Sequence, residues 1–255
     1  MPRVIGIGDN VVDKYLHTGI MYPGGNALNF AVFAKMAGAD AAYLGSFGSD
    51  PAAAHIQAVL RQLGVDASRC RQLEGENGFA RVTLVNGNRV FLPGNAGGVM
   101  RLHPLELSHG DLQYIGEFQL AHSSCYSYLE PQLGRLRATG VPLSFDFSSR
   151  IEGEYLRLVC PHVDFAFFSA EENSDEASIG SMLRTMQALG CTVAAATRGK
   201  KGAMVLYNGA ILQQPAEPIE VRDTMGAGDS FLTTFLLRFM DLCGWDRRAL
   251  ASCSE

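Results

Sequence analysis

Short apolar runs alternate with helical segments along most of the chain, and this alternation restricts the fold more than any other feature of the sequence. Buried strands are expected at 4–9, 41–44, 119–122, 143–147, 165–168 and 193–197. Helices are expected between them, at 26–37, 52–63, 129–139, 154–159 and 177–189. Strands that alternate with helices predict a parallel sheet with helices on both faces, so the fold class is α/β.

Two segments interrupt the alternation with hairpin signals. The sequences NGN at 86–88 and NG at 208–209 each lie between two short apolar runs, which is typical of a tight β-hairpin. We expect the first hairpin to belong to a small β-sheet lid beside the main sheet. The lid would be contributed by residues 13–24 and 69–95, within a single domain that spans residues 1–255.

Composition and charge exclude several function classes. The net charge is −5 and the basic residues form no long run, which argues against a nucleic-acid partner. No apolar stretch approaches the length of a membrane span, and no targeting segment is recognisable. The six cysteines are scattered without metal-ligand spacing, as expected of free thiols in a reducing compartment. We therefore expect a cytoplasmic protein without a membrane partner.

The most specific motif is DTMGAGDS at 223–230, which precedes an apolar run expected to be helical. Its glycines allow a tight turn with uncovered backbone amides. At a helix start, such amides and the positive helix end would stabilise charge on a phosphoryl group. Asp229 in this turn could accept a proton from an attacking hydroxyl. The structural alternative is that Asp229 only caps the helix.

Polar residues beside glycines or at strand ends form two further candidate sites. Asp9 ends the first strand and Asn26 follows a glycine pair, and both side-chain types hydrogen-bond sugar hydroxyls. Asn26 could instead cap the helix that follows it. The segment TRGKKG at 197–202 follows a strand and offers backbone amides and a hydroxyl to a phosphate. The sequence contains no P-loop, dinucleotide, HExxH or GxSxG motif.

In this order and spacing, the motifs resemble those of the PfkB (ribokinase-like) carbohydrate kinases over about residues 4–240. Within that family the chain resembles the fructoselysine 6-kinase (fructosamine kinase) branch, through GDN at 8–10, GVM at 98–100, FDFS at 145–148 and PHVDFAF at 161–167. The resemblance implies a three-layer α/β/α sandwich with a mostly parallel sheet and a small β-sheet lid.

The resemblance also implies a reaction and its site residues. The reaction would be ATP-dependent phosphorylation of a primary hydroxyl of a sugar-like substrate, converting fructoselysine or a related fructosamine to its 6-phosphate. The cofactors would be ATP and Mg²⁺, with K⁺ as a further candidate.

The implied catalytic residues are Asp229, Gly226, Ala227 and Gly228. The implied substrate-binding residues are Asp9, Gly25, Asn26, Asn29 and Asn95. The implied nucleotide-binding residues are Thr197, Arg198, Gly199, Gly202, Thr224, Gly226 and Gly228. Glu172 is the implied metal-binding residue.

The chain departs from the family pattern at two places. Ser169 stands where the family has the asparagine of Asn-x-x-Glu, although Glu172 is kept. The sequence also ends at residue 255, whereas family members usually continue with another helix and a final strand or loop that help close the adenine pocket. A kinase for another ketose or a nucleoside remains an alternative. A catalytically weak sugar-binding or regulatory relative is an alternative of a different class. A homodimer formed through the lid is a further expectation from the family.

Overall fold

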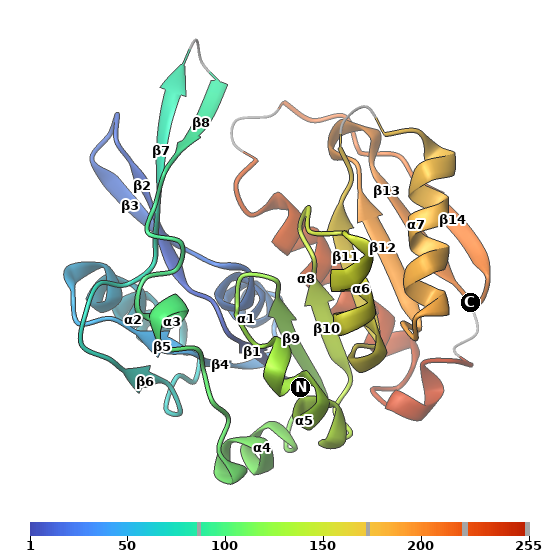
Figure 1. Ribbon diagram of the computed structural model, residues 1–255, viewed down its shortest axis with the longest axis horizontal. Helices are drawn as coiled ribbons and strands as arrows, with labels where there is room; N and C mark the ends of the chain where they lie inside the picture. The colour runs from blue at the N-terminus through green and yellow to red at the C-terminus, as the bar shows by residue number, and fades with distance from the viewer. Residues whose placement is uncertain (86–87, 172–173, 221–223, 253–255) are drawn as a thin grey trace.

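The computed structural model of the protein describes residues 1–85, 88–171, 174–220 and 224–252. Its largest sheet has eight strands in the order β14-β13-β12-β11-β10-β9-β1-β4 (Figure 1). The six strands from β12 to β4 are parallel, whereas β13 and β14 are antiparallel to their neighbours. The strands of this sheet are β1 Arg3–Ile7, β4 Asp40–Leu44, β9 Leu120–Ser124, β10 Leu143–Asp146, β11 Phe165–Ser169, β12 Val193–Thr197, β13 Ala203–Tyr207 and β14 Ala210–Gln214.

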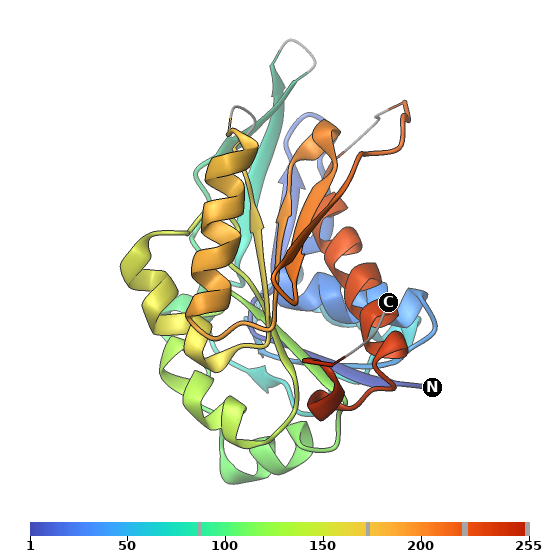
Figure 2. The same ribbon diagram turned by 90° about the vertical axis from the view of Figure 1, so that its right-hand side faces the viewer.

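Helices cover both faces of this sheet, with α7 and α8 on opposite sides (Figure 2). The strand sequences explain the two layers, because successive side chains point to opposite faces. In β11, Phe165 and Phe167 join the core under α8, while Ala166 and Phe168 join the core on the other face. The helices are α1 Asn26–Met36, α2 Pro51–Leu63, α3 Val99–Leu102, α4 His109–Ile115, α5 Leu133–Ala138, α6 Gly153–Val159, α7 Glu176–Ala188 and α8 Ala227–Leu242. Short 3₁₀ turns occur at Glu130–Gln132, Cys160–His162, Gly199–Lys201 and Arg247–Ala249.

A second sheet of four strands, in the order β3-β2-β7-β8, projects beside the main sheet (Figure 1). Its strands are β2 Val11–Tyr15, β3 Ile20–Gly24, β7 Phe79–Val85 and β8 Asn88–Leu92. We call this sheet the lid. β2 begins only two residues after Asp9, so the lid joins the main sheet at the end of β1. Residues of β6 (Arg71–Gln72) pair with β5 (Ser46–Phe47) in a separate two-stranded sheet rather than with the lid strands.

The predicted α/β fold with a mostly parallel sheet and a small separate sheet is confirmed. Asn208 and Gly209 both have positive φ, 47° and 77°, which fits the tight turn predicted between β13 and β14. The short helices α3 and α4 and the β5–β6 pair were not predicted. Each is too short to show a period in the sequence.

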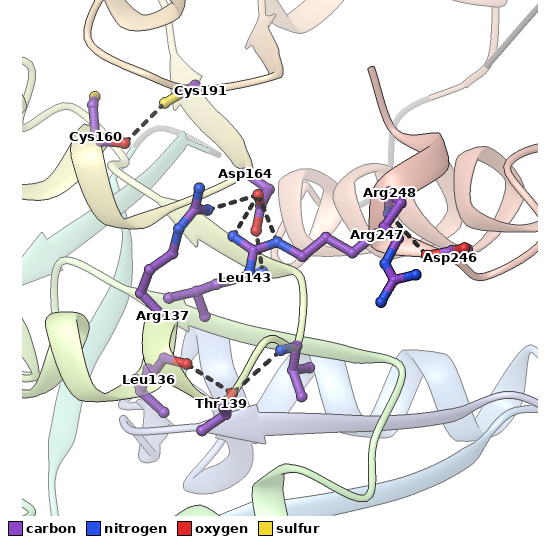
Figure 3. A network of polar contacts seen from close by, with 11 residues as sticks. Leu136, Arg137, Thr139, Leu143, Cys160, Asp164, Cys191, Asp246, Arg247 and Arg248 are labelled. Atoms are coloured by element: carbon purple, nitrogen blue, oxygen red, sulfur yellow. Dashed lines mark hydrogen bonds and ion pairs between the residues drawn. The ribbon is translucent and has the colours of Figure 1, made fainter. Parts of the chain in front are cut away.

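At the amino ends of the parallel strands, Asp164 links the C-terminal segment to the main sheet (Figure 3). Its carboxylate accepts hydrogen bonds from Arg137 Nη1 at 2.7 Å, from Arg247 Nη2 at 3.1 Å and from the Leu143 N–H at 2.9 Å. A second link runs from the Tyr207 hydroxyl to the Leu250 carbonyl at 2.8 Å. The polar network therefore anchors the segment that follows α8, at the end of the sheet away from the predicted site.

The cysteines differ in part from the expectation of free thiols. Cys70, Cys125, Cys160 and Cys191 are free. Cys243, which is buried at the end of α8, is instead disulfide-bonded, so the expectation is wrong there. Within the described part of the chain, no helix is both long and apolar enough to cross a membrane.

Candidate active site

The predicted site residues gather where the parallel strands end and two helices begin. Asp9 follows β1, while Asp146 and Thr197 are the last residues of β10 and β12. Helices α1 and α8 begin at the same edge and pack against each other. In open α/β sheets, this carboxyl edge is where ligands bind.

Asp9 is buried and its carboxylate is fully engaged with the chain. Oδ2 accepts the N–H of Asn26 at 2.7 Å, and Oδ1 accepts the N–H of Ala27 at 3.2 Å. The hydroxyls of Ser124 and Ser127 also donate to Oδ1, each at 2.8 Å. Asp9 therefore satisfies the first amides of α1 and ties the helix to the end of β9.

The alternative that Asn26 caps α1 is wrong. The N-cap position is occupied by Gly25, whose φ is 108°, and Asn26 is the first helical residue. A Cβ at Gly25 would lie 2.8 Å from Asn10 Cα and 2.8 Å from the Asp9 carbonyl oxygen. Only glycine allows this approach, and it brings the start of α1 within reach of the Asp9 carboxylate. The Asn26 side chain is thus available for another contact.

That contact is with Asp146, a residue not predicted as part of the site. Asn26 Nδ2 donates to Asp146 Oδ2, and the N–H of Ser148 donates to Oδ1 at 2.8 Å. The pKa of Asp146 is raised to about 7, chiefly by burial and also by the negative charges of Asp229 and Asp9, while the hydrogen bonds from Ser148 and Asn26 lower it. The available signal was an acidic residue at the end of an apolar strand, the pattern that identified Asp9. The serines that contact Asp9 carried no such signal.

Asp229 lies in the first turn of α8 and contacts Asn29, a predicted substrate-binding residue of α1. Asn29 Nδ2 donates to Asp229 Oδ2 at 2.7 Å. The pKa of Asp229 is raised to about 6, chiefly by burial; the Asn29 hydrogen bond lowers it, and the charges of Asp9 and Asp13 raise it. The N-cap of α8 is Gly226, and no side chain caps the helix. The alternative that Asp229 serves only as the N-cap is therefore wrong.

The start of α8 offers unsatisfied backbone donors beside Asp229. Gly226 adopts a left-handed conformation with φ of 69°. Among the described residues, the N–H groups of Gly228 and Asp229 have no hydrogen-bond acceptor. A Cβ at Gly228 would meet nothing within 4 Å, so this turn is open. Free amides at the positive end of a 16-residue helix suit an anionic phosphoryl group.

The predicted nucleotide segment forms a 3₁₀ turn after β12. Thr197 Oγ1 lies 3.4 Å from Ser169 Oγ, so two hydroxyls meet at the ends of β12 and β11. The Arg198 guanidinium pairs with Glu176 at 2.9 Å, while its N–H donates to the Gly202 carbonyl at 2.8 Å. Arg198 therefore holds the turn in place, and its side chain is already engaged with α7.

An open hollow of about 550 Å³ runs along α8 beside its first turn. The residues that line it are Ala227, Ser230, Phe231, Thr234, Phe235 and Arg238. The rings of Phe231 and Phe235 stack with their centres 6.2 Å apart. The hollow thus has an aromatic wall next to the free amides. Of the other predicted residues, Thr224 is exposed, while Glu172 lies outside the described residues.

Asn95 is engaged at the base of the lid. Its Oδ1 accepts the N–H of Phe79 at 2.9 Å, and its Nδ2 donates to the Asn77 carbonyl at 2.7 Å. A further bond from Nδ2 reaches Glu76 at 3.2 Å. These contacts hold the start of β7. The hydrogen-bonding atoms of Asn95 are therefore occupied by the chain, unlike the exposed amides at the start of α8.

Comparison with known proteins places this chain in a family. The family model of "pfkB family carbohydrate kinase" matches residues 4–252. The chain is 43% identical to fructosamine kinase FrlD of Bacillus subtilis, over 93% of this chain and 83% of that protein. It is 31% identical to fructoselysine 6-kinase of Escherichia coli, over 96% of this chain and 90% of that protein. The structure of Arabidopsis thaliana ribokinase complexed with ribose and ATP matches with a TM-score of 0.79 and 21% identity, covering all of this chain and 96% of that one. The chain therefore belongs to the pfkB family of carbohydrate kinases.

Proposed function

We propose that the protein transfers the γ-phosphoryl group of ATP to the 6-hydroxyl of a fructosamine such as fructoselysine. The observation that carries this proposal is Asp229, a half-buried carboxylate oriented by Asn29 beside free amides at the start of α8. The substrate class is supported by the two relatives named as fructosamine and fructoselysine kinases.

In the proposed reaction, Asp229 accepts the proton of the attacking hydroxyl. Its pKa, raised to about 6, leaves it ionised at neutral pH yet more basic than an exposed aspartate. The Asn29 amide fixes the orientation of the carboxylate. The N–H groups of Gly228 and Asp229 would donate to the oxygens of the transferring phosphoryl group, where negative charge must be stabilised.

ATP would lie between the turn that follows β12 and the start of α8. Backbone groups of 197–202 and the Thr197 hydroxyl would contact its phosphates, and the hollow along α8 would take its base. Mg²⁺ supplies charge neutralisation on the phosphates when it is bound. It needs only one or two carboxylates because it keeps waters and phosphate oxygens as ligands. Glu172 remains the proposed protein ligand, and it lies outside the described residues.

The lid would close over the substrate and exclude water, which competes as phosphoryl acceptor. The β2–β3 hairpin of the lid exposes Leu16, Ile20 and Tyr22, which are 50%, 48% and 50% exposed. These side chains support the proposal that two lids pack together in a homodimer. A cytoplasmic location, where ATP is available, and a K⁺ requirement belong to the same proposal.

The test is ADP release from ATP and Mg²⁺ against a panel of fructoselysine, other fructosamines, fructose, ribose and adenosine. A kcat/KM for the fructosamines well above that for fructose, ribose or adenosine is the expected result. Turnover with fructose or adenosine alone would replace the substrate with another ketose or a nucleoside. Sugar binding without turnover by folded protein would contradict the proposal and favour a regulatory relative.

A further inference from the structure

A fructosamine differs from a simple ketose by a secondary amine, which carries a positive charge at neutral pH. A site that selects fructosamines must therefore present an acceptor for a cation as well as acceptors for hydroxyls. Of the carboxylates that gather at the carboxyl edge of the sheet, two already have roles. Asp9 is saturated by hydrogen bonds from the chain, and Asp229 is assigned to the reacting hydroxyl.

Asp146 has the contacts expected of a cation acceptor within the same site. Its Oδ2 accepts the side-chain amide of Asn26, a predicted substrate-binding residue, and its other oxygen accepts only the N–H of Ser148 among the described residues. No salt bridge reaches its carboxylate within the described part of the chain. A carboxylate holds about four acceptor positions, so Asp146 keeps acceptor capacity for a ligand.

The charged groups around Asp146 leave its negative charge uncompensated. Asp9 after β1 and Asp229 in α8 are both negative and both disfavour its ionised form. Arg150, four residues further on, donates to the Cys125 carbonyl at 3.0 Å and lies over the Tyr155 ring at 4.2 Å. The Arg150 guanidinium therefore interacts with these two groups and forms no ion pair with Asp146 within the described part of the chain. A cationic ligand would relieve the unfavourable placement of Asp146 in a way that a neutral sugar cannot.

Tyr126 provides a second feature that suits a cation. Tyr126 is 46% exposed, and its hydroxyl donates to Ser148 Oγ at 3.0 Å. Ser148 is the residue whose N–H holds Asp146. The charges of Asp146 and Asp9 are near enough to raise the pKa of the Tyr126 hydroxyl, after burial as the larger cause. An aromatic ring beside a carboxylate is a common surrounding for a bound ammonium group.

We propose that Asp146 is the specificity-determining residue of the site and binds the secondary ammonium group of a fructosamine, with Tyr126 beside it. This inference rests on the proposed kinase function but assigns selection of the substrate to a different residue from the one that performs proton transfer. The cation and Asp146 would form a charge-assisted hydrogen bond inside a partly buried site.

The experiment compares two substrates that differ in one atom. N-butyl fructosamine carries the amine, and the corresponding butyl ether of fructose carries oxygen in its place. The ratio of kcat/KM for the amine to kcat/KM for the ether is measured for the wild type and for Asp146→Asn. We expect the substitution to lower this ratio about 10- to 100-fold, as for a hydrogen bond between charged groups. An unchanged ratio in folded variant protein overturns the inference.

A measurement on the wild type covers the case in which Asp146→Asn does not fold. The pKa of Asp146 is raised to about 7, so the carboxylate loses its charge as the pH falls through that value. The ratio of kcat/KM for the amine to kcat/KM for the ether should therefore fall as the pH is lowered from 8 to 6. Protonation of Asp229 does not change this ratio, because it affects both substrates equally. A ratio independent of pH contradicts the inference. Absence of turnover with every sugar would instead contradict the proposed function.

Discussion

The two halves of the site differ in how far the chain satisfies its own polar groups. On the sugar side, Asp9 accepts four hydrogen bonds and Asn29 is fixed on Asp229. On the nucleotide side, the amides of Gly228 and Asp229 have no acceptor among the described residues, and residues 215–220 are exposed. The sugar side is thus organised before its ligand arrives. The nucleotide side has donors whose partners would be phosphate oxygens.

A matched pair of glycine substitutions tests this difference most strongly. Gly25 and Gly199 both have positive φ, 108° and 53°. A Cβ at Gly25 meets backbone atoms at 2.8 Å, whereas a Cβ at Gly199 meets nothing within 4 Å. We expect Gly25→Ala to lower kcat/KM for the sugar more than about 100-fold, because a 1 Å displacement of Asn26 or Asn29 has effects of that size. Gly199→Ala, which adds only strain of about 1 kcal/mol, should keep most activity. Equal losses would contradict the comparison.

Asp9→Asn should destabilise the protein as well as weaken sugar binding. The amide nitrogen of asparagine cannot accept the hydrogen bonds that the second carboxylate oxygen accepts, so the start of α1 loses a cap and a charged acceptor. We expect the free energy of unfolding to fall by about 2–4 kcal/mol. Urea denaturation measures this change. The matched control is Asp241→Asn, which removes a charge from the exposed end of α8. This substitution should change the free energy of unfolding far less.

The pH profile of the kinase reports the state of Asp229. The carboxylate must be ionised to accept a proton, and its pKa is raised to about 6. The value of kcat/KM for a neutral sugar should therefore fall about tenfold for each pH unit below 6. It should be constant between pH 7 and pH 8. A profile that falls only below pH 4 would show that an exposed carboxylate limits the reaction.

The smallest effect is expected on the nucleotide side. Thr197→Ala removes one hydroxyl, whose only hydrogen-bond partner among the described residues is Ser169 Oγ at 3.4 Å. We expect the KM for ATP to rise about tenfold or less, the size of one neutral hydrogen bond. The melting temperature and the KM for the sugar should stay unchanged. A large fall in melting temperature would show that this side is organised by the chain after all.

Local sequence signals predicted the layered fold and part of the site. The apolar runs identified the strands, and the acid at the end of the first strand identified Asp9. The glycine-rich motif before an apolar helical run identified the turn before α8. The contacts that complete the site join residues far apart in the sequence, such as Asn29 with Asp229 and Asn26 with Asp146. No local pattern records such pairs. The same limit explains the error over the cap of α1, since the capping carboxylate comes from the end of β1 and not from the helix itself.

The central claim is that Asp229 removes the proton of the attacking hydroxyl, and its most direct test is the kcat of Asp229→Asn. ADP release with a fructosamine and saturating ATP and Mg²⁺ is compared with the wild type, together with the melting temperature of each protein. We predict that kcat falls about 10²- to 10⁴-fold while the melting temperature changes by no more than a few degrees. A variant that keeps its fold and turns over within threefold of the wild type would contradict the claim.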